Sequence, residues 1–174
     1  TTNLGGQFAV GYATTATGYV AFTSGYSTTA SGNYSTAMGE SSTASGANST
    51  ALGKSTSASG NYSTSLGKST IASGSQSTAL GESSTASGYA SLATGRSNTA
   101  SGYNATAMGR ASTASGYYST VMGYNATASD FASFVIGQYN SSGSSATSAG
   151  SYDVSSPAFV IGNGTASNAK SDAF

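Results

Sequence analysis

The sequence predicts an all-β fold, a parallel β-roll or solenoid whose coils each span fourteen residues. Three observations support this fold class. Glycine recurs every seven residues from Gly11 to Gly137, and only Asp130 interrupts the series. Two kinds of seven-residue unit alternate, one usually with a bulky residue before its glycine and one with Ser, so the true period is fourteen residues. Small residues also alternate with other residues inside each unit, which is the period-two pattern of a strand.

The alternation assigns an inside and an outside to each strand. In residues 35–39 and 42–46, the first, third and fifth residues are Ser, Ala and Gly. Successive side chains of a strand point to opposite faces, so these three share one face. Two strands lying back to back would enclose a thin interior that only residues of this size can fill. The two residues after each glycine are then the corners, and glycine suits the chain reversal because it tolerates positive φ.

One outward face of the predicted coils is apolar. Most alternate units place Met, Leu, Ile or Val directly before the glycine, with Thr or Phe two residues earlier. Coils stack about 4.8 Å apart, so these side chains form a continuous stripe that would promote association of a monomer. We therefore predict an interface between chains; a dimer, or a stripe covered by another domain, is the alternative. The predicted interface residues are Phe8, Val10, Met38, Leu52, Leu66, Leu80, Met108, Met122, Phe134, Ile136, Phe159 and Ile161.

The opposite outward face is polar. It carries Thr or Ser at both outward positions of each unit, with Ile71 as the apolar exception. Regular rows of Thr are also typical of ice-binding solenoids, which gives a rival function. The interruption of the Thr row by Ser57 and Ile71 argues against that rival.

Other repetitive structures fit the sequence poorly. A coiled coil would need paired apolar positions and no glycine in each seven-residue unit. Collagen would need glycine at every third residue and abundant Pro, whereas the chain has one Pro. A disordered linker would not keep Ala two residues, and Met or Leu one residue, before the glycine. The positional pattern therefore favours the solenoid.

The composition excludes several function classes. Only 6% of residues are charged, five basic and five acidic, so nucleic acid and anionic membrane surfaces are poor partners. Without Cys or His, we expect no enzyme, no metal site and no cofactor. No apolar run approaches the length needed to cross a bilayer, so we expect no membrane insertion. The start lacks an initiator Met and a signal peptide, and we expect a processed segment of a longer protein.

Two residue types mark candidate ligand contacts in the predicted corners. Six charged residues recur there at fourteen-residue spacing: Glu40, Lys54, Lys68, Glu82, Arg96 and Arg110. Neighbouring Glu and Lys should attract, whereas Arg96 and Arg110 place like charges side by side and could bind an anion. Tyr, with twelve copies, offers amphipathic contact area for sugars or extended peptides. The candidate contacts are Tyr34, Tyr62, Tyr103, Tyr117, Tyr118, Arg96 and Arg110.

The fourteen-residue unit resembles the head repeats of trimeric autotransporter adhesins, the YadA-like family, whose coils alternate an SVAIG-type strand with an SxAxG-type strand. The closest local matches are residues 133–137 (SFVIG) and 158–162 (AFVIG). This chain departs from the pattern by using Thr where the motif usually has Val, and Met or Leu where it has Ile. The resemblance implies a left-handed roll and a parallel homotrimer. Neither the handedness nor the number of chains follows from the spacing.

The resemblance also implies a function and a domain arrangement. It implies a surface-exposed head that attaches to host cells, extracellular matrix or another surface through an extracellular protein or glycan ligand. Similar repeats occur in phage and viral tail fibres, so a structural spacer of such a fibre is the alternative. The parent protein would be anchored in a bacterial outer membrane through a stalk, or would belong to a virion tail fibre. Residues 1–140 would be the head repeats, and residues 141–174 irregular coils leading toward a neck.

Overall fold

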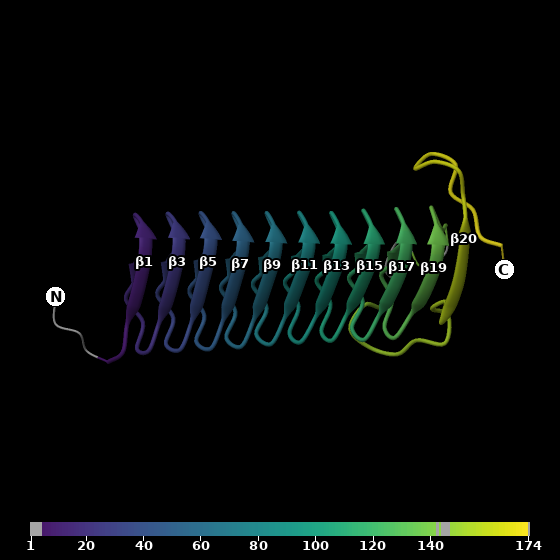
Figure 1. Ribbon diagram of the computed structural model, residues 1–174. Coiled ribbons are helices and arrows are strands. Elements are labelled where there is room, and N and C mark those ends of the chain that lie inside the picture. Colours follow the sequence, from purple (N-terminus) through teal and green to yellow (C-terminus); the bar gives the residue numbers. More distant parts are fainter. Residues whose placement is uncertain (1–4, 142, 144–146, 174) are drawn as a thin grey trace.

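The computed structural model describes residues 5–141, 143 and 147–173, which wind into one stack of coils (Figure 1). Most coils contribute one strand of five residues and one of two. The longer strands are β1 (Phe8–Tyr12), β3 (Phe22–Tyr26), β5 (Thr36–Glu40), β7 (Thr50–Lys54), β9 (Thr64–Lys68), β11 (Thr78–Glu82), β13 (Leu92–Arg96), β15 (Thr106–Arg110), β17 (Thr120–Tyr124), β19 (Phe134–Gln138) and β20 (Phe159–Asn163). The shorter strands are β2 (Thr15–Ala16), β4 (Thr29–Ala30), β6 (Thr43–Ala44), β8 (Ser57–Ala58), β10 (Ile71–Ala72), β12 (Thr85–Ala86), β14 (Thr99–Ala100), β16 (Thr113–Ala114) and β18 (Thr127–Ala128).

The strands form two parallel sheets, one from each strand type. The long sheet runs from β1 through the odd-numbered strands to β19 and then β20, and the short sheet runs from β2 to β18. From β1 to β19 each residue pairs with the residue fourteen positions later, as Met108 does with Met122. The structure therefore confirms an all-β parallel solenoid with fourteen-residue coils, and its described residues make about nine turns.

The interior between the two sheets is as thin as the sequence predicts. Ala37, Ala51 and Ala79 of the long sheet are completely buried, as are Ala44 and Ala86 of the short sheet. Side chains this small leave little distance between the sheets. The apolar area buried per coil is correspondingly small, so hydrogen bonding between coils carries much of the stability.

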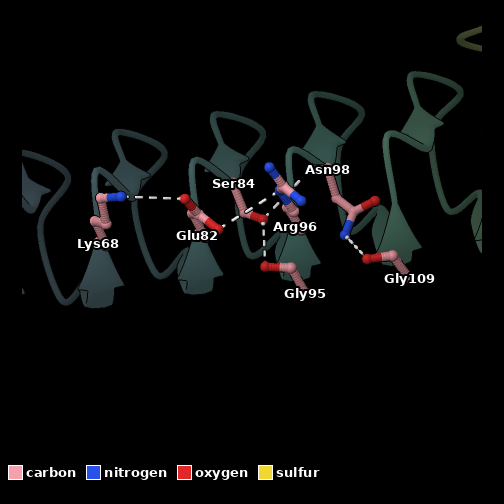
Figure 2. Close-up of polar contacts among 7 residues, drawn as sticks. All are labelled: Lys68, Glu82, Ser84, Gly95, Arg96, Asn98 and Gly109. Atoms are coloured by element: carbon pink, nitrogen blue, oxygen red, sulfur yellow. Dashed lines mark hydrogen bonds and ion pairs between the residues drawn. The ribbon is translucent and has the colours of Figure 1, made fainter.

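Buried polar side chains link the two sheets across this interior. The hydroxyl of Ser84 donates to the carbonyl of Gly95 in the long sheet at 3.2 Å. Asn98 takes the equivalent place one coil later, and its amide donates to the carbonyl of Gly109 at 2.6 Å (Figure 2). It also donates to the carbonyl of Thr94 at 2.8 Å. These bonds satisfy carbonyl groups of the long strands that would otherwise be buried beside an apolar interior.

The glycine columns exist because consecutive coils touch. A Cβ atom on Gly39 would collide with the carbonyl oxygen of Gly53 in the next coil, and one on Gly32 with that of Gly46. Only the long-sheet column also has positive φ, which is 108° at Gly39. The prediction that glycine supplies the positive φ of the chain reversal is therefore wrong, because the glycines with positive φ lie inside the long strands. Close packing of consecutive coils explains both columns. At the corners the positive φ falls on non-glycine residues, such as Ser41 with φ of 54°.

Asp130 occupies the last place of the short-sheet glycine column. A Cβ atom on Gly116 would collide with the carbonyl oxygen of Asp130, but no short strand of the described chain stacks on Asp130 itself. A side chain is therefore tolerated there. Its carboxylate oxygen Oδ1 accepts the backbone N–H groups of Thr147 and Ser148 at 2.6 and 2.9 Å, which holds the following segment.

The segment between β19 and β20 replaces a short strand. Phe134 pairs with Phe159, 25 positions later (159 − 134), which is eleven more than the fourteen-residue coil. The side-chain amide of Asn140 covers the end of the short sheet. It accepts the N–H of Thr127 and donates to the Thr127 carbonyl, both at 2.8 Å, so it imitates the backbone of a further strand. This arrangement closes an edge that would otherwise offer unpaired groups to another chain.

Residues after β20 fold back on the end of the stack (Figure 1). The N–H of Ala173 donates to the carbonyl of Ile161, and the N–H of Asn163 donates to the carbonyl of Ser171. The region predicted as irregular coils, residues 141–174, therefore contains one regular strand, β20, in register with β19. The domain boundary at residue 140 stays a prediction.

Candidate functional site: an apolar sheet face and its borders

All twelve predicted interface residues lie on outward positions of the long sheet. Strand register places them in rows along the stack, as Leu52, Leu66 and Leu80 are paired in consecutive strands. We call this surface the apolar face. It consists of Phe8, Val10, Phe22, Met38, Leu52, Leu66, Leu80, Leu92, Met108, Met122, Phe134, Ile136, Phe159 and Ile161. Every one of these side chains is at least partly exposed to solvent in the single chain.

The two ends of the apolar face are aromatic, whereas its centre is aliphatic. The rings of Phe8 and Phe22 stack with centroids 5.3 Å apart, and those of Phe134 and Phe159 with centroids 5.7 Å apart. Between them the face alternates Thr with Met or Leu in most strands. The face is therefore continuous but not uniform along its length.

Sequence reasoning missed two members of this face, Phe22 and Leu92. Both lie three residues before their glycine, in units whose residue directly before the glycine is polar, Ser24 and Thr94, and the prediction named only units with an apolar residue there. Phe22 pairs with Phe8 in the sheet, and Leu92 pairs with Thr78. The fourteen-residue spacing from Phe8 to Phe22 was the signal that could have found the first.

The six charged residues of the repeat border the apolar face; we call them the charged border. The prediction placed them in a corner, but the structure corrects this: each is the last residue of a long strand, as Glu40 is of β5. The pairing of the long sheet continues for one residue beyond the glycine. The charges therefore lie at the end of the long strands, one position beyond the glycine that follows the Met or Leu row.

Ion pairs link neighbouring coils along the charged border. Lys54 lies 3.0 Å from Glu40 and Lys68 lies 3.3 Å from Glu82, so both predicted attractions are confirmed. Arg96 also approaches the second oxygen of Glu82, at 3.5 Å (Figure 2). All of these side chains are well exposed, so each pair contributes about 0–1 kcal/mol to stability.

Arg110 ends the charged border differently. Its guanidinium lies 5.3 Å from the centre of the Tyr124 ring, a cation–π distance. A hydrogen bond with the hydroxyl of Tyr139 lowers the pKa of Tyr124, and the charge of Arg110 acts in the same direction. The same hydrogen bond raises the pKa of Tyr139. Arg96 and Arg110, the candidate anion-binding pair, thus each face a different neighbour, a carboxylate and an aromatic ring.

The candidate Tyr residues lie at the other end of the long strands, in the corner that precedes each of them. Tyr103, Tyr117 and Tyr118 come together there, with ring centroids of Tyr103 at 5.9 Å from Tyr117 and 5.8 Å from Tyr118. Tyr34 and Tyr62 occupy the same corner several coils away. The predicted ligand contacts therefore form no single site, because the Arg and Tyr residues are separated by the length of a strand.

The outer face of the short sheet carries the predicted polar rows. Ile71 is exposed between Ser57 and Thr85, its partners in the neighbouring strands. The Thr row is thus interrupted in the middle of the stack. This interruption weakens the ice-binding alternative, which needs a regular array.

The described residues form no pocket, no cluster of three or more metal-ligating acidic side chains and no helix long and apolar enough to cross a membrane. The fold and the exposed apolar face define the class of the protein as a structural repeat solenoid with a surface suited to association.

The model of the YadA head domain repeat matches residues 24–42, 30–56, 44–70, 72–98, 100–126 and 114–139, about two thirds of the chain. The chain belongs to this family, which is structural and non-enzymatic and implies a surface-exposed, extracellular adhesin-type protein. No curated protein matches the chain significantly.

Proposed function

We propose that this chain is the head of a trimeric, surface-exposed adhesin, in which three parallel copies meet through their apolar faces. The observation that carries the proposal is the continuity of that face, which extends from β1 to β20. A cyclic assembly would cover the face in every copy and leave no apolar surface uncovered. The number three and a left-handed winding are taken from the family.

The aromatic ends of the apolar face support an in-register arrangement. In such an assembly the Phe8 and Phe22 rings of one copy lie level with those of the other copies, and Phe134 and Phe159 do the same at the other end. A copy shifted along the stack would set aromatic rings against Thr, so packing favours aromatic ends at the same level. Because both ends are aromatic, the parallel orientation is taken from the family.

The surfaces left outside in this trimer are the polar face of the short sheet and the corners. Attachment to host cells, extracellular matrix or another surface would use them, with an extracellular protein or glycan as the ligand. The parent protein would be displayed on a bacterial surface through a stalk and an outer-membrane anchor, or on a virion tail fibre.

Sedimentation equilibrium tests the assembly. We expect a species of three times the 16.8 kDa chain mass. Leu66→Glu should dissociate it, because the substitution buries three carboxylates at the proposed axis. Ile71→Glu is the matched control, since Ile71 lies in the same coil on the short sheet with nearly equal exposure, 43% against 41%. Equal effects of the two substitutions, or a wild-type monomer, would refute the trimer.

A spacer of a tail fibre is the second candidate, and the regular fourteen-residue stacking of the ten long strands from β1 to β19 favours it. Beads coated with the protein separate the two functions. If the chain is an adhesin head, at least ten times more protein-coated beads than albumin-coated beads should stay attached to a glycoprotein-coated surface. A spacer should give no difference.

A further inference from the structure

We propose that a cluster of aromatic residues at the corner before β13, β15, β17 and β19 binds neutral glycans. The cluster, called here the aromatic corner, consists of Tyr89, Tyr103, Tyr117, Tyr118 and Phe131. This inference rests on the proposed adhesive function and names the chemistry of its ligand. The aromatic corner shares no residue with the apolar face.

The fold does not require aromatic side chains at these positions. Tyr89, Tyr103, Tyr117 and Phe131 occupy the first corner position of four consecutive coils. In the four preceding coils the same position carries Asn33, Ala47, Asn61 and Ser75, and those coils have the same strands and the same pairing. Since Ala or Ser is sufficient to build the corner, the exposed rings need an explanation outside the fold.

The rings are ordered by mutual contact but remain accessible. Tyr89 and Tyr103 stack with centroids 4.9 Å apart and planes 12° apart. Tyr118 meets Tyr103 and Phe131 edge to face, with centroids at 5.8 and 5.4 Å. The four Tyr side chains are between 38% and 49% exposed. A patch of fixed rings loses little conformational entropy when a ligand binds, which favours affinity.

Part of the segment between β19 and β20, residues 147–150, lies beside one end of the aromatic corner, near the starts of the long strands (Figure 1). The N–H of Tyr117 donates to the carbonyl of Ala149, and the N–H of Phe131 to that of Ser148, both at 2.8 Å. Both bonds use the backbone, and the edge of the Tyr117 ring also lies beside Gly150 of this segment. The segment thus borders the aromatic corner without covering it, since the four Tyr side chains stay exposed.

The chemistry of the aromatic corner matches an uncharged, hydroxyl-rich ligand. Its side chains offer carbon rings and phenol hydroxyl groups, and the charged border lies at the opposite end of the long strands. An anionic ligand would find no countercharge among the rings themselves. Sugars present both apolar C–H faces and hydroxyl groups, the two features that Tyr can contact at once.

The spacing of the rings favours a repeating ligand. Consecutive coils are about 4.8 Å apart, so the contacts recur on the scale of one sugar ring. A linear oligosaccharide repeats its own contacts at a similar interval and can engage several rings in succession. A folded protein surface has no such repeat. We therefore assign a linear, neutral glycan rather than a protein as the ligand.

Binding of the trimeric protein to immobilised chitohexaose, mannohexaose and poly-N-acetyllactosamine tests the proposal. Heparin provides an anionic comparison, and an unglycosylated recombinant gelatin provides a protein comparison. We expect the wild type to bind at least one neutral glycan, and the double variant Tyr103→Ala/Tyr117→Ala to bind it at least tenfold more weakly. Both substitutions introduce the residue that Ala47 already places in this corner column. Circular dichroism and sedimentation should match those of the wild type.

Tyr19→Ala is the control, because Tyr19 lies in the same corner column outside the aromatic corner and is similarly exposed. It should retain wild-type binding within twofold. The proposal is overturned if the wild type binds none of the neutral glycans, if heparin or gelatin is bound instead, or if the double variant binds as well as the control. A trimer whose beads adhere to surfaces before and after enzymatic deglycosylation would leave the adhesin function standing while the glycan assignment fails.

Discussion

The long and short sheets share one interior, but their outer faces differ. An exposed apolar residue belongs to a continuous apolar row on the long sheet and is isolated on the short sheet. Leu66 on β9 and Ile71 on β10 belong to the same coil. Leu66 is paired with Leu52 and Leu80, so it continues an apolar row. Ile71 is flanked by Ser and Thr and stands alone. A single exposed apolar residue is ordinary, and it is continuity across coils that indicates an interface.

Substitutions in the two glycine columns should have the largest effect on the stability of the fold. Gly53→Ala and Gly60→Ala should each destabilise the fold by more than about 3 kcal/mol, because the new Cβ atom meets backbone of the next coil. Gly53→Ala should be the worse of the two, since its φ of 132° adds strain that Gly60 does not have. Urea unfolding followed by circular dichroism measures the difference. Ser59→Ala, a neighbouring exposed change, should stay within about 0.5 kcal/mol of the wild type. A stable Gly60→Ala protein would refute the packing explanation of the short-sheet column.

Substitutions that remove the polar links between the sheets should have the second largest effect on stability. Asn98→Leu removes the amide that donates to Thr94 and Gly109, and leaves both carbonyls buried without that partner. We expect a loss of about 2–4 kcal/mol in the free energy of unfolding. Asn98→Ser inserts the residue found at Ser84 and Ser112 in this column and should lose clearly less. If the two variants were equally stable, the links would not matter to the stack.

The corners give a smaller effect of opposite sign. Ala90 and Ala111 lie at the two different corners with φ of 49° and 54°. Replacing either with Gly removes the strain of a left-handed backbone conformation that is unfavourable for L-residues. The free energy of unfolding should therefore rise by up to about 1 kcal/mol, which thermal unfolding detects as a higher midpoint. The gain should be similar at both corners because the backbone is similar. A loss at both would mean that the greater freedom of Gly in the unfolded chain prevails.

The charged border gives the smallest effect. Glu82 contacts two cations, Lys68 and Arg96, whereas Glu40 pairs with one cation of the described chain, Lys54. Glu82→Gln should destabilise the protein more than Glu40→Gln, but by less than about 1 kcal/mol because these side chains are exposed. Added salt should abolish the difference, which thermal unfolding at low and high ionic strength can detect. A salt-independent loss would indicate that Glu82 acts through packing.

Much of the coil follows from the sequence because its constraints are local and repeated. The period, the buried Ala positions and twelve of the fourteen residues of the apolar face depend on side-chain size at fixed spacing, and these positions were predicted correctly from residues such as Ala37 and Leu52. The use of this face as an interface stays a prediction. The unequal strand lengths were not predicted. Strand pairing past Gly39 depends on its positive φ and on the corner conformation of Ser41, neither of which the residue types reveal.

The C-terminal coil and the aromatic corner were harder to predict for another reason. Residues 139–158 contain no repeat, so the register of β20 could not be extrapolated from the fourteen-residue period, although 134–137 and 159–162 have the same sequence, FVIG. Three of the five residues of the aromatic corner were named as candidates. Tyr89 and Phe131 were left out, because their grouping becomes clear only when the corner column is followed through consecutive coils.

The pairing of each residue with the one fourteen positions later allows the number of coils to change during evolution. In the described part of the chain from β1 to β19, each strand pairs only with the equivalent strands of the coils before and after it. Removing or adding one unit of fourteen residues therefore leaves the cross-section, the interior and the stacking of the remaining coils as they were. Recombination between near-identical repeats in a gene can thus shorten or lengthen the rod in steps of about 4.8 Å. Length becomes a trait that can vary freely, while width is fixed by the size of Ala, Ser and Gly.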